Sequence, residues 1–214
     1  MQDLDIRGAG NLLGAEQSGF IADLGYETYQ KILKEAVTEL RTEEFSDVVT
    51  SDTPEEEMEY VADCVIESDM ELLFPASYVP GESERISLYQ ELDSIERELD
   101  LQAFRSRLTD RFGKLPHEAA ELLRIPRLRR LARRLGIEKV VLKQGTMFIY
   151  FVDDSNKAYY QSPMFGRILR YLQENPKRCR IRETNGRRSF AIANVTTVET
   201  AVAILDHILA SQSL

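Results

Sequence analysis

Four glycines crowd the first stretch of the chain, Asp3–Gly19, together with one arginine, Arg7, and one glutamine, Gln17. Glycine lets a backbone adopt positive φ or approach a ligand closely, so this density is typical of a loop that holds a phosphate or folds against a neighbouring segment. The context of a phosphate site is missing, because no strand pattern precedes the glycines and no Gly-Lys-Ser/Thr follows them. The spacing Gly8-x-Gly10-x-x-x-Gly14 also departs from the dinucleotide-binding pattern. The stretch therefore indicates the tail of a larger functional element and not a nucleotide site of its own.

Other residues that could carry out catalysis are sparse. Only two histidines occur, His117 and His207, and neither has a partner at metal-ligand spacing, so both are interpreted as surface or packing residues. The two cysteines, Cys64 and Cys179, are far apart and predict reduced thiols in the cytoplasm. No Gly-x-Ser-x-Gly elbow, His-Glu-x-x-His pair or Walker sequence is present. We therefore expect no catalytic residue, metal site or cofactor within this chain.

The composition is that of a folded, soluble protein. The 214 residues allow one medium domain or two small ones, and 43% of them are hydrophobic. No apolar run approaches the roughly 20 residues that cross a bilayer, and the first 20 residues lack the pattern of a signal peptide. We therefore expect a cytoplasmic protein without membrane contact. The net charge of -9 argues against a stand-alone DNA-binding protein.

The charges are unevenly distributed along the chain. No lysine or arginine occurs between Arg41 and Arg85, and residues 42–60 combine many acids with few large apolar side chains. This composition predicts an acidic linker between residues 1–41 and a domain at 61–214. One interpretation is a solvated connector. The alternative is an acidic surface that docks on a basic partner or repels DNA.

Hydrophobic periodicity predicts helices in the first half of the chain. A helix is expected in 20–41, one or two short strands in 61–73, a helix that Ser83 caps, and another that ends at Gly113. A helical pattern then runs from Pro116 to Leu135 with Gly136 as its cap. Pro126 lies inside this pattern and should kink the helix or begin a new one.

From Val140 onward the pattern changes to that of strands. One hairpin is expected from Lys139–Leu142 and Met147–Val152, and another from 178–183 and 187–193 around Asn185-Gly186. Helices are expected over Phe165–Leu172 and Thr197–Leu209. The fold class predicted for 61–214 is α+β, a compact domain of helices packed on antiparallel hairpins.

The helical pattern at 124–134 carries the main basic cluster. Arg127, Arg130 and Arg134 share one helix face, opposite the leucines. This face is a possible phosphate-binding surface, and a nucleic-acid-binding module that also uses the 178–188 hairpin is one hypothesis. It is equally a solvated face, or a complement to the acidic stretch upstream.

The opening motif, Asp-Leu-Asp-Ile-Arg-Gly-Ala-Gly-Asn-Leu-Leu-Gly followed by Gln-Ser-Gly at Gln17, resembles the end of the second motor lobe in the transcription-repair coupling factors. The branch-migration helicase RecG carries a similar but less close version. The resemblance implies that the motif belongs to a helical hairpin and loop that couple ATP hydrolysis to movement on duplex DNA. It implies that Arg7 and Gln17 are the coupling residues, and that Gly8, Gly10 and Gly14 let the loop fold back.

A second group of motifs resembles the C-terminal domain peculiar to the coupling factors, which RecG lacks. These motifs are Tyr78-Val-Pro80, Arg85-Ile-Ser-Leu-Tyr89, Leu108-Thr-Asp-Arg-Phe-Gly113-x-Leu-Pro116 and Leu135-Gly-Ile137. The family resemblance implies a parent protein that is an ATP-dependent double-stranded DNA translocase. Such a protein displaces stalled RNA polymerase and recruits the excision-repair protein UvrA, with ATP and Mg bound by motor domains upstream of this chain.

The resemblance also implies a role for the domain itself. In this family the C-terminal domain packs on the UvrA-binding module of the same protein and hides its binding surface until the motor engages. The expectation is an autoinhibitory domain, with the basic face of Arg127 and Arg130 or the acidic strand region as part of its docking surface. A homodimer through apolar positions of a helix at 26–40 is a further, weaker hypothesis.

Overall fold

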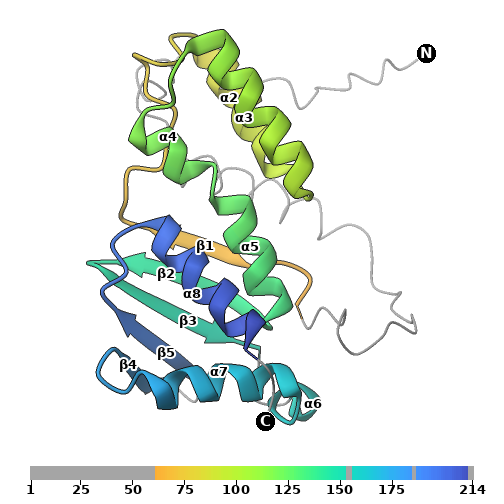
Figure 1. Cartoon of the computed structure of the whole chain (residues 1–214), viewed down its shortest axis with the longest axis vertical. Coiled ribbons are helices and arrows are strands. Elements are labelled where there is room, and N and C mark those ends of the chain that lie inside the picture. Colours follow the sequence, from red (N-terminus) through yellow and green to blue (C-terminus); the bar gives the residue numbers. More distant parts are fainter. Residues whose placement is uncertain (1–60, 153–155, 185–186, 212–214) are drawn as a thin grey trace, which may run out of the picture.

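The computed structural model describes residues 61–152, 156–184 and 187–211. The glycine-rich motif, the helix expected at 20–41 and the acidic linker at 42–60 lie outside the described residues, as does the Asn185-Gly186 turn. Within the described part, helices and a single sheet form an α+β domain, as predicted (Figure 1). The buried side chains make one continuous hydrophobic core.

The sheet has five strands in the order β1-β2-β3-β5-β4. Their bounds are β1 Val65–Ser68, β2 Ile137–Lys143, β3 Thr146–Phe151, β4 Cys179–Thr184 and β5 Arg187–Ala193. Both predicted hairpins are confirmed, because β2 pairs with β3 and β4 pairs with β5 in antiparallel register. The β2–β3 turn at Gln144-Gly145 has positive φ at both residues (51° and 67°), which matches the twist of the two strands.

Two pairings were not predicted from the sequence: the antiparallel pairing of β3 with β5, which joins the two hairpins, and the pairing of β1. Strand β1 joins the sheet parallel to β2, with Val65 opposite Lys139, so the sheet is mixed and not built of hairpins alone. A parallel pair requires a long crossover, and here the crossover consists of all the helices between β1 and β2. The periodicity of single strands does not contain this information.

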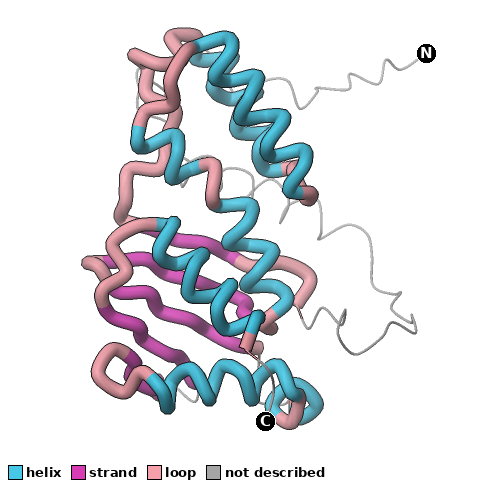
Figure 2. Tube along the Cα trace, viewed as in Figure 1, coloured by secondary structure: helices cyan, strands magenta, loops and turns pink. Residues whose placement is uncertain are grey.

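Four helices cover one face of the sheet, and Figure 2 shows α5 and α8 crossing it. Alternate residues of β3 are buried beneath them (Met147, Ile149 and Phe151), whereas the residues between these are only half-buried. The ring of Phe151 contacts Tyr159 of α6 and Phe165 of α7, so these two helices lie on the same face. The bounds are α5 Ile125–Arg134, α6 Lys157–Tyr160, α7 Pro163–Glu174 and α8 Val198–Ala210.

The remaining helices, α2 (Glu82–Asp93), α3 (Glu98–Phe112) and α4 (His117–Leu122), form a helical lobe beyond the β1 edge of the sheet (Figure 1). Ion pairs Arg107–Glu91 and Arg111–Glu84 join α3 to α2 as antiparallel neighbours. The Tyr89 hydroxyl accepts a hydrogen bond from the Phe74 N–H (3.0 Å) inside this lobe. Its helices therefore pack by both apolar and polar contacts.

Three local predictions need correction or refinement. Ser83 does not cap a helix, because α2 begins at Glu82 with Gly81 as its N-cap residue. The long helical pattern is two helices, and Pro126 stands in the first turn of the second, where its missing N–H costs nothing. Helix α7 begins at Pro163, earlier than expected, because the Ser162 hydroxyl accepts from the Phe165 N–H. Helix α6 was not predicted.

Gly136 ends α5 at the point where the helical and sheet layers meet. Its φ is 68°, and a Cβ built at this position would lie 2.2 Å from Cε2 of Tyr159. Tyr159 is fully buried, and its hydroxyl donates to the Leu135 carbonyl (2.6 Å). Glycine is therefore required at this position by both backbone conformation and packing.

The substitution Gly136→Ala should lower the free energy of unfolding by about 3 kcal/mol, since it adds left-handed strain to an overpacked contact. Gly166→Ala is the matched control, because a Cβ at this position of α7 would meet nothing within 4 Å. It should stabilise the protein by about 0.5–1 kcal/mol through helix propensity. Urea unfolding of both variants measures the difference, and a neutral Gly136→Ala would contradict the packing of Tyr159.

Candidate docking surface

Helix α5 carries the basic cluster and sits between the two halves of the domain. It buries its apolar side against β1, β2 and α8, with Ile125, Leu128 and Ala132 fully buried. The arginines consequently occupy the other sides of the helix. This arrangement follows directly from the amphipathic pattern of the sequence.

The structure gives several of these arginines acidic partners from other helices. Arg127 pairs with Asp206 of α8 and Arg130 with Glu98 of α3, both at 2.7 Å. Arg129 pairs with Asp93 at the end of α2 (2.8 Å). These arginines join α5 to the surrounding helices, so binding of a nucleic acid here would have to compete with existing carboxylate contacts.

Glu121 is the one buried carboxylate of the described residues. Its Oε2 accepts from the backbone N–H of Val198 (2.6 Å) and of Glu199 (3.3 Å) at the start of α8, and its Oε1 accepts from Arg124 (2.9 Å). A carboxylate at a helix N-terminus accepts hydrogen bonds from N–H groups that have no partner within the helix, and its negative charge is attracted to the positive end of the helix dipole. Glu121 therefore fixes α4, in the helical lobe, to α8 on the sheet.

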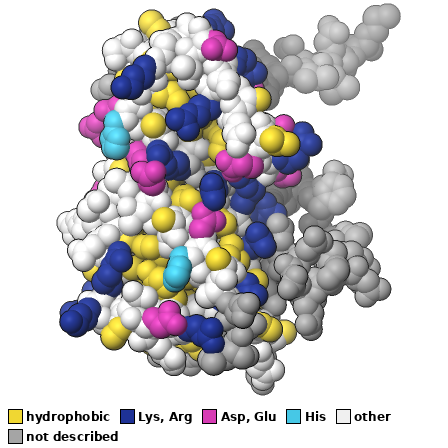
Figure 3. Space-filling model, viewed as in Figure 1, with side chains coloured by type: hydrophobic (Ala, Val, Ile, Leu, Met, Phe, Trp, Pro, Cys, Tyr) yellow, Lys and Arg dark blue, Asp and Glu magenta, His cyan; other side chains and the backbone are white. Residues whose placement is uncertain are grey.

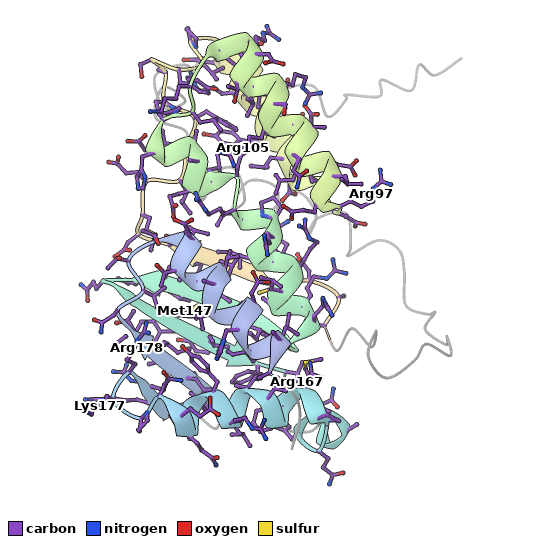
Figure 4. All side chains as sticks on the ribbon, in the orientation of Figure 1. Arg97, Arg105, Met147, Arg167, Lys177 and Arg178 are labelled. Carbon is purple, nitrogen blue, oxygen red and sulfur yellow. The ribbon has the colours of Figure 1, made fainter. Side chains whose placement is uncertain are left out.

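A groove of about 300 Å³ lies where α3, α4, α5 and α8 meet. Its floor is apolar, formed by side chains such as Leu101, Leu123 and Val202. Charged residues of both signs surround it: Glu98, Arg105, Arg124, Arg127, Glu199 and Asp206. Figure 3 shows apolar and oppositely charged side chains interleaved over this region, and Figure 4 marks Arg105 on the helical lobe. An apolar floor with a charged margin is the composition of a polar, reversible protein interface.

The predicted site residues fall into three groups. Arg7, Gln17, Gly8, Gly10 and Gly14 lie outside the described residues. Arg127 lines the groove, and Arg130 contacts the groove residue Glu98. Arg134 is exposed at the far end of α5 and is not part of the groove.

Sequence reasoning missed the acidic half of this surface. Asp206 and Glu199 of α8 line the groove, and the buried Glu121 beside it stands within the run Ala-Ala-Glu-Leu-Leu. One signal for it was available in the sequence. Glu121 is a charged residue in the leucine-containing part of a short helix, which predicts that its carboxylate is either exposed there or buried against a partner. One partner, Arg124, lies three residues away, whereas the two N–H groups of α8 lie 77 and 78 residues away and no local pattern identifies them.

The histidines and cysteines show no site chemistry in the described structure. His117 and His207 are exposed, and His207 stacks edge-on against Tyr171. Burial, reinforced by the neighbouring Asp63, raises the pKa of the Cys64 thiol to about 12, so it stays protonated and unreactive at neutral pH. No group of three or more His, Cys, Asp or Glu is placed to hold a metal within the described residues. None of the described helices is long and apolar enough to span a bilayer.

Comparison with known proteins gives consistent matches. Residues 68–162 match the family model described as TRCF domain. The chain is 34% identical over 181 residues to a transcription-repair-coupling factor of Escherichia coli strain K12, covering 84% of this chain and 14% of that protein. It is 32% identical over 181 residues to the protein of the same name from Staphylococcus epidermidis, covering 82% and 14%. For Rickettsia typhi the identity is 30% over 183 residues, covering 86% and 15%.

A solved structure matches the fold. The crystal structure of the C-terminal domain of transcription-repair coupling factor aligns with a TM-score of 0.56, covering 70% of this chain and 94% of that one. The two sequences are 16% identical, so this match concerns the fold alone.

We predict that Glu121→Ala lowers the free energy of unfolding by about 3 kcal/mol, because it leaves two helix N–H groups and the Arg124 guanidinium without their acceptor. Glu121→Gln retains the shape and an acceptor oxygen and should cost about 1 kcal/mol. Glu118→Ala, on the same helix, is the control and should change stability by less than about 0.5 kcal/mol. Equal losses at positions 118 and 121, measured by urea unfolding, would show that the buried carboxylate does not join the lobes.

Proposed function

Because the chain belongs to the family of transcription-repair-coupling factors, we propose that it is the C-terminal part of an ATP-dependent double-stranded DNA translocase that acts in transcription-coupled nucleotide excision repair. The parent protein displaces stalled RNA polymerase and recruits UvrA. The names of the relatives and the TRCF domain at 68–162 support this proposal. The chain spans about 14% of the length of these relatives. In this proposal ATP and Mg are bound by a motor in upstream parts of the parent.

Residues 1–41 have a distinct role in this proposal. Their glycine-rich motif is the end of the motor lobe, with Arg7 and Gln17 coupling ATP hydrolysis to movement and with Gly8, Gly10 and Gly14 shaping the loop. The catalytic activity resides in the parent motor. The domain that follows residues 42–60 carries out no reaction and acts by binding.

The domain at 61–214 is proposed to dock on the UvrA-binding module of its own parent and to inhibit UvrA recruitment until the motor engages. The groove between α3, α4, α5 and α8 is the observation that carries this assignment. Interfaces that must open again within one protein are modest in area and more polar than permanent ones. The apolar floor supplies affinity, and the margin that contains Arg105, Arg127 and Asp206 supplies orientation and easy release in water.

Charge reversal of the basic margin tests this assignment. The double variant Arg127→Glu/Arg130→Glu in the full-length parent should increase UvrA binding at least about fivefold, because it weakens the inhibitory contact between domain and module. Binding is measured by titration of labelled UvrA without nucleotide. Both arginines form partly exposed ion pairs, so the effect on folding should be small.

The matched control is Lys143→Glu/Lys177→Glu, which makes the same change of charge at exposed positions outside the groove. Figure 4 shows Lys177 near β4, far from Arg105 on the helical lobe. The control should leave UvrA binding unchanged. If the arginine variant also binds UvrA like the wild type, the groove is not the docking surface.

A further inference from the structure

The second face of the sheet is covered by none of the described helices. Alternation places Val141, Phe148, Ala191 and Arg180 in one row across β2, β3, β5 and β4 on this face. The next row consists of Lys139, Tyr150, Ser189 and Arg182. The helices α5 to α8 pack on the opposite side, where Ile149, Phe151 and Phe190 are buried. On this open face Ser189 and Ala191 are buried, Phe148 and Tyr150 are half-buried, and the exposed side chains are those of Arg180 and Arg182.

The open face is basic in a chain that is acidic as a whole. Arg180 and Arg182 are exposed on the edge strand β4, and Lys143 is exposed at the end of β2. Its described acid, Glu67 on β1, is already paired with Lys139 (2.7 Å). The guanidinium of Arg182 lies over the ring of Phe148 (5.4 Å), which holds it flat against the sheet. Arg180 and Arg182 therefore lie on the same side of β4, and neither forms an ion pair with a carboxylate of the described residues.

We propose that the open face binds the acidic segment 42–60 of the same chain. This segment contains eight acids and no lysine or arginine: Glu43, Glu44, Asp47, Asp52, Glu55, Glu56, Glu57 and Glu59. Its charge is therefore opposite to that of the face. The segment also carries Phe45, Val48 and Val49, which suit the half-buried Phe148 and Tyr150.

Chain continuity makes this contact geometrically simple. The segment joins the domain at Val61, four residues before the edge strand β1. Crossing from β1 to β4 takes four strand spacings, about 19 Å. The 19 residues of the segment reach up to about 60 Å when extended, so the arginines of β4 are well within range.

A carboxylate segment fits this face better than a nucleic acid does. Sheet surfaces that bind single strands offer bare aromatic rings on which bases stack. Here Arg182 already occupies the ring of Phe148, so the face offers guanidinium groups for bidentate contact with carboxylates. Attachment through Val61 also gives the segment an effective concentration in the millimolar range, which a free polyanion must exceed. The segment therefore acts as an internal competitor that keeps other acidic partners off the sheet.

Neutralisation of the segment tests this proposal in the whole chain. The variant Glu55→Gln/Glu56→Gln/Glu57→Gln/Glu59→Gln should bind a short fluorescent poly-glutamate peptide about tenfold more tightly than the wild type at low ionic strength, because the competitor is weakened. Adding Arg180→Glu/Arg182→Glu should abolish that gain. Amide chemical shifts of Ser189 and Ala191 should also change when the segment is neutralised.

The control pair is Arg97→Glu/Lys114→Glu, which reverses two exposed charges on the helical lobe outside the groove and should leave the gain intact. Three outcomes would overturn the proposal. The first is that the wild type and the variant with the neutralised segment bind the peptide equally tightly and show the same amide chemical shifts on β5. The second is a gain that survives the reversal of Arg180 and Arg182. The third concerns single-stranded oligothymidine. If the wild type binds it as tightly as the neutralised variant does, and if this binding requires Arg180 and Arg182, the face binds nucleic acid instead of the segment.

Discussion

The buried carboxylate of Glu121 is the contact on which the arrangement of the two halves depends. An ionised side chain removed from water is stable only with strong partners, and Glu121 finds them in two backbone N–H groups of α8 and the guanidinium of Arg124. Because these partners come from different elements, the requirement fixes α4 and α8 relative to each other. The groove lies beside this contact, because Ala120, Arg124 and Glu199 are among its lining residues.

The arginines of α5 also join helices through charged contacts, but at the surface of the domain. Arg127, Arg129 and Arg130 each reach an acid on a different helix, so α5 is joined to α8, α2 and α3. Exposed ion pairs contribute little to stability individually, but they orient charges of both signs around an apolar floor. A surface of this kind can bind and release a partner domain without either side unfolding. The docking role proposed for the groove uses that property.

The motifs that carry the family resemblance turn out to be largely structural in the described domain. Arg85 is buried and donates to the carbonyls of Val79 (2.7 Å) and Pro80 (3.1 Å), which fixes the turn before α2. The Tyr78 hydroxyl lies within hydrogen-bond distance of two carbonyl acceptors near the end of α3, those of Leu108 (3.2 Å) and Gly113 (3.0 Å). Gly136 makes room for Tyr159. These residues identify the fold, whereas the surfaces proposed to bind partners are built from other side chains.

The sequence by itself determined the local elements, the α+β class and the chemistry of individual segments. Hairpins β2–β3 and β4–β5, the break at Pro126 and the basic stripe of α5 follow from periodicity, turn residues and proline geometry, which act over a few neighbouring residues. Tertiary structure alone decided the parallel pairing of β1 with β2, the partners of Arg127 and Arg130, the burial of Glu121 and the face of the sheet that the helices leave uncovered. These features join residues tens of positions apart, and their energies depend on which surfaces meet when the core closes. A local pattern records that a side chain is charged, but only the packed fold determines which group neutralises it.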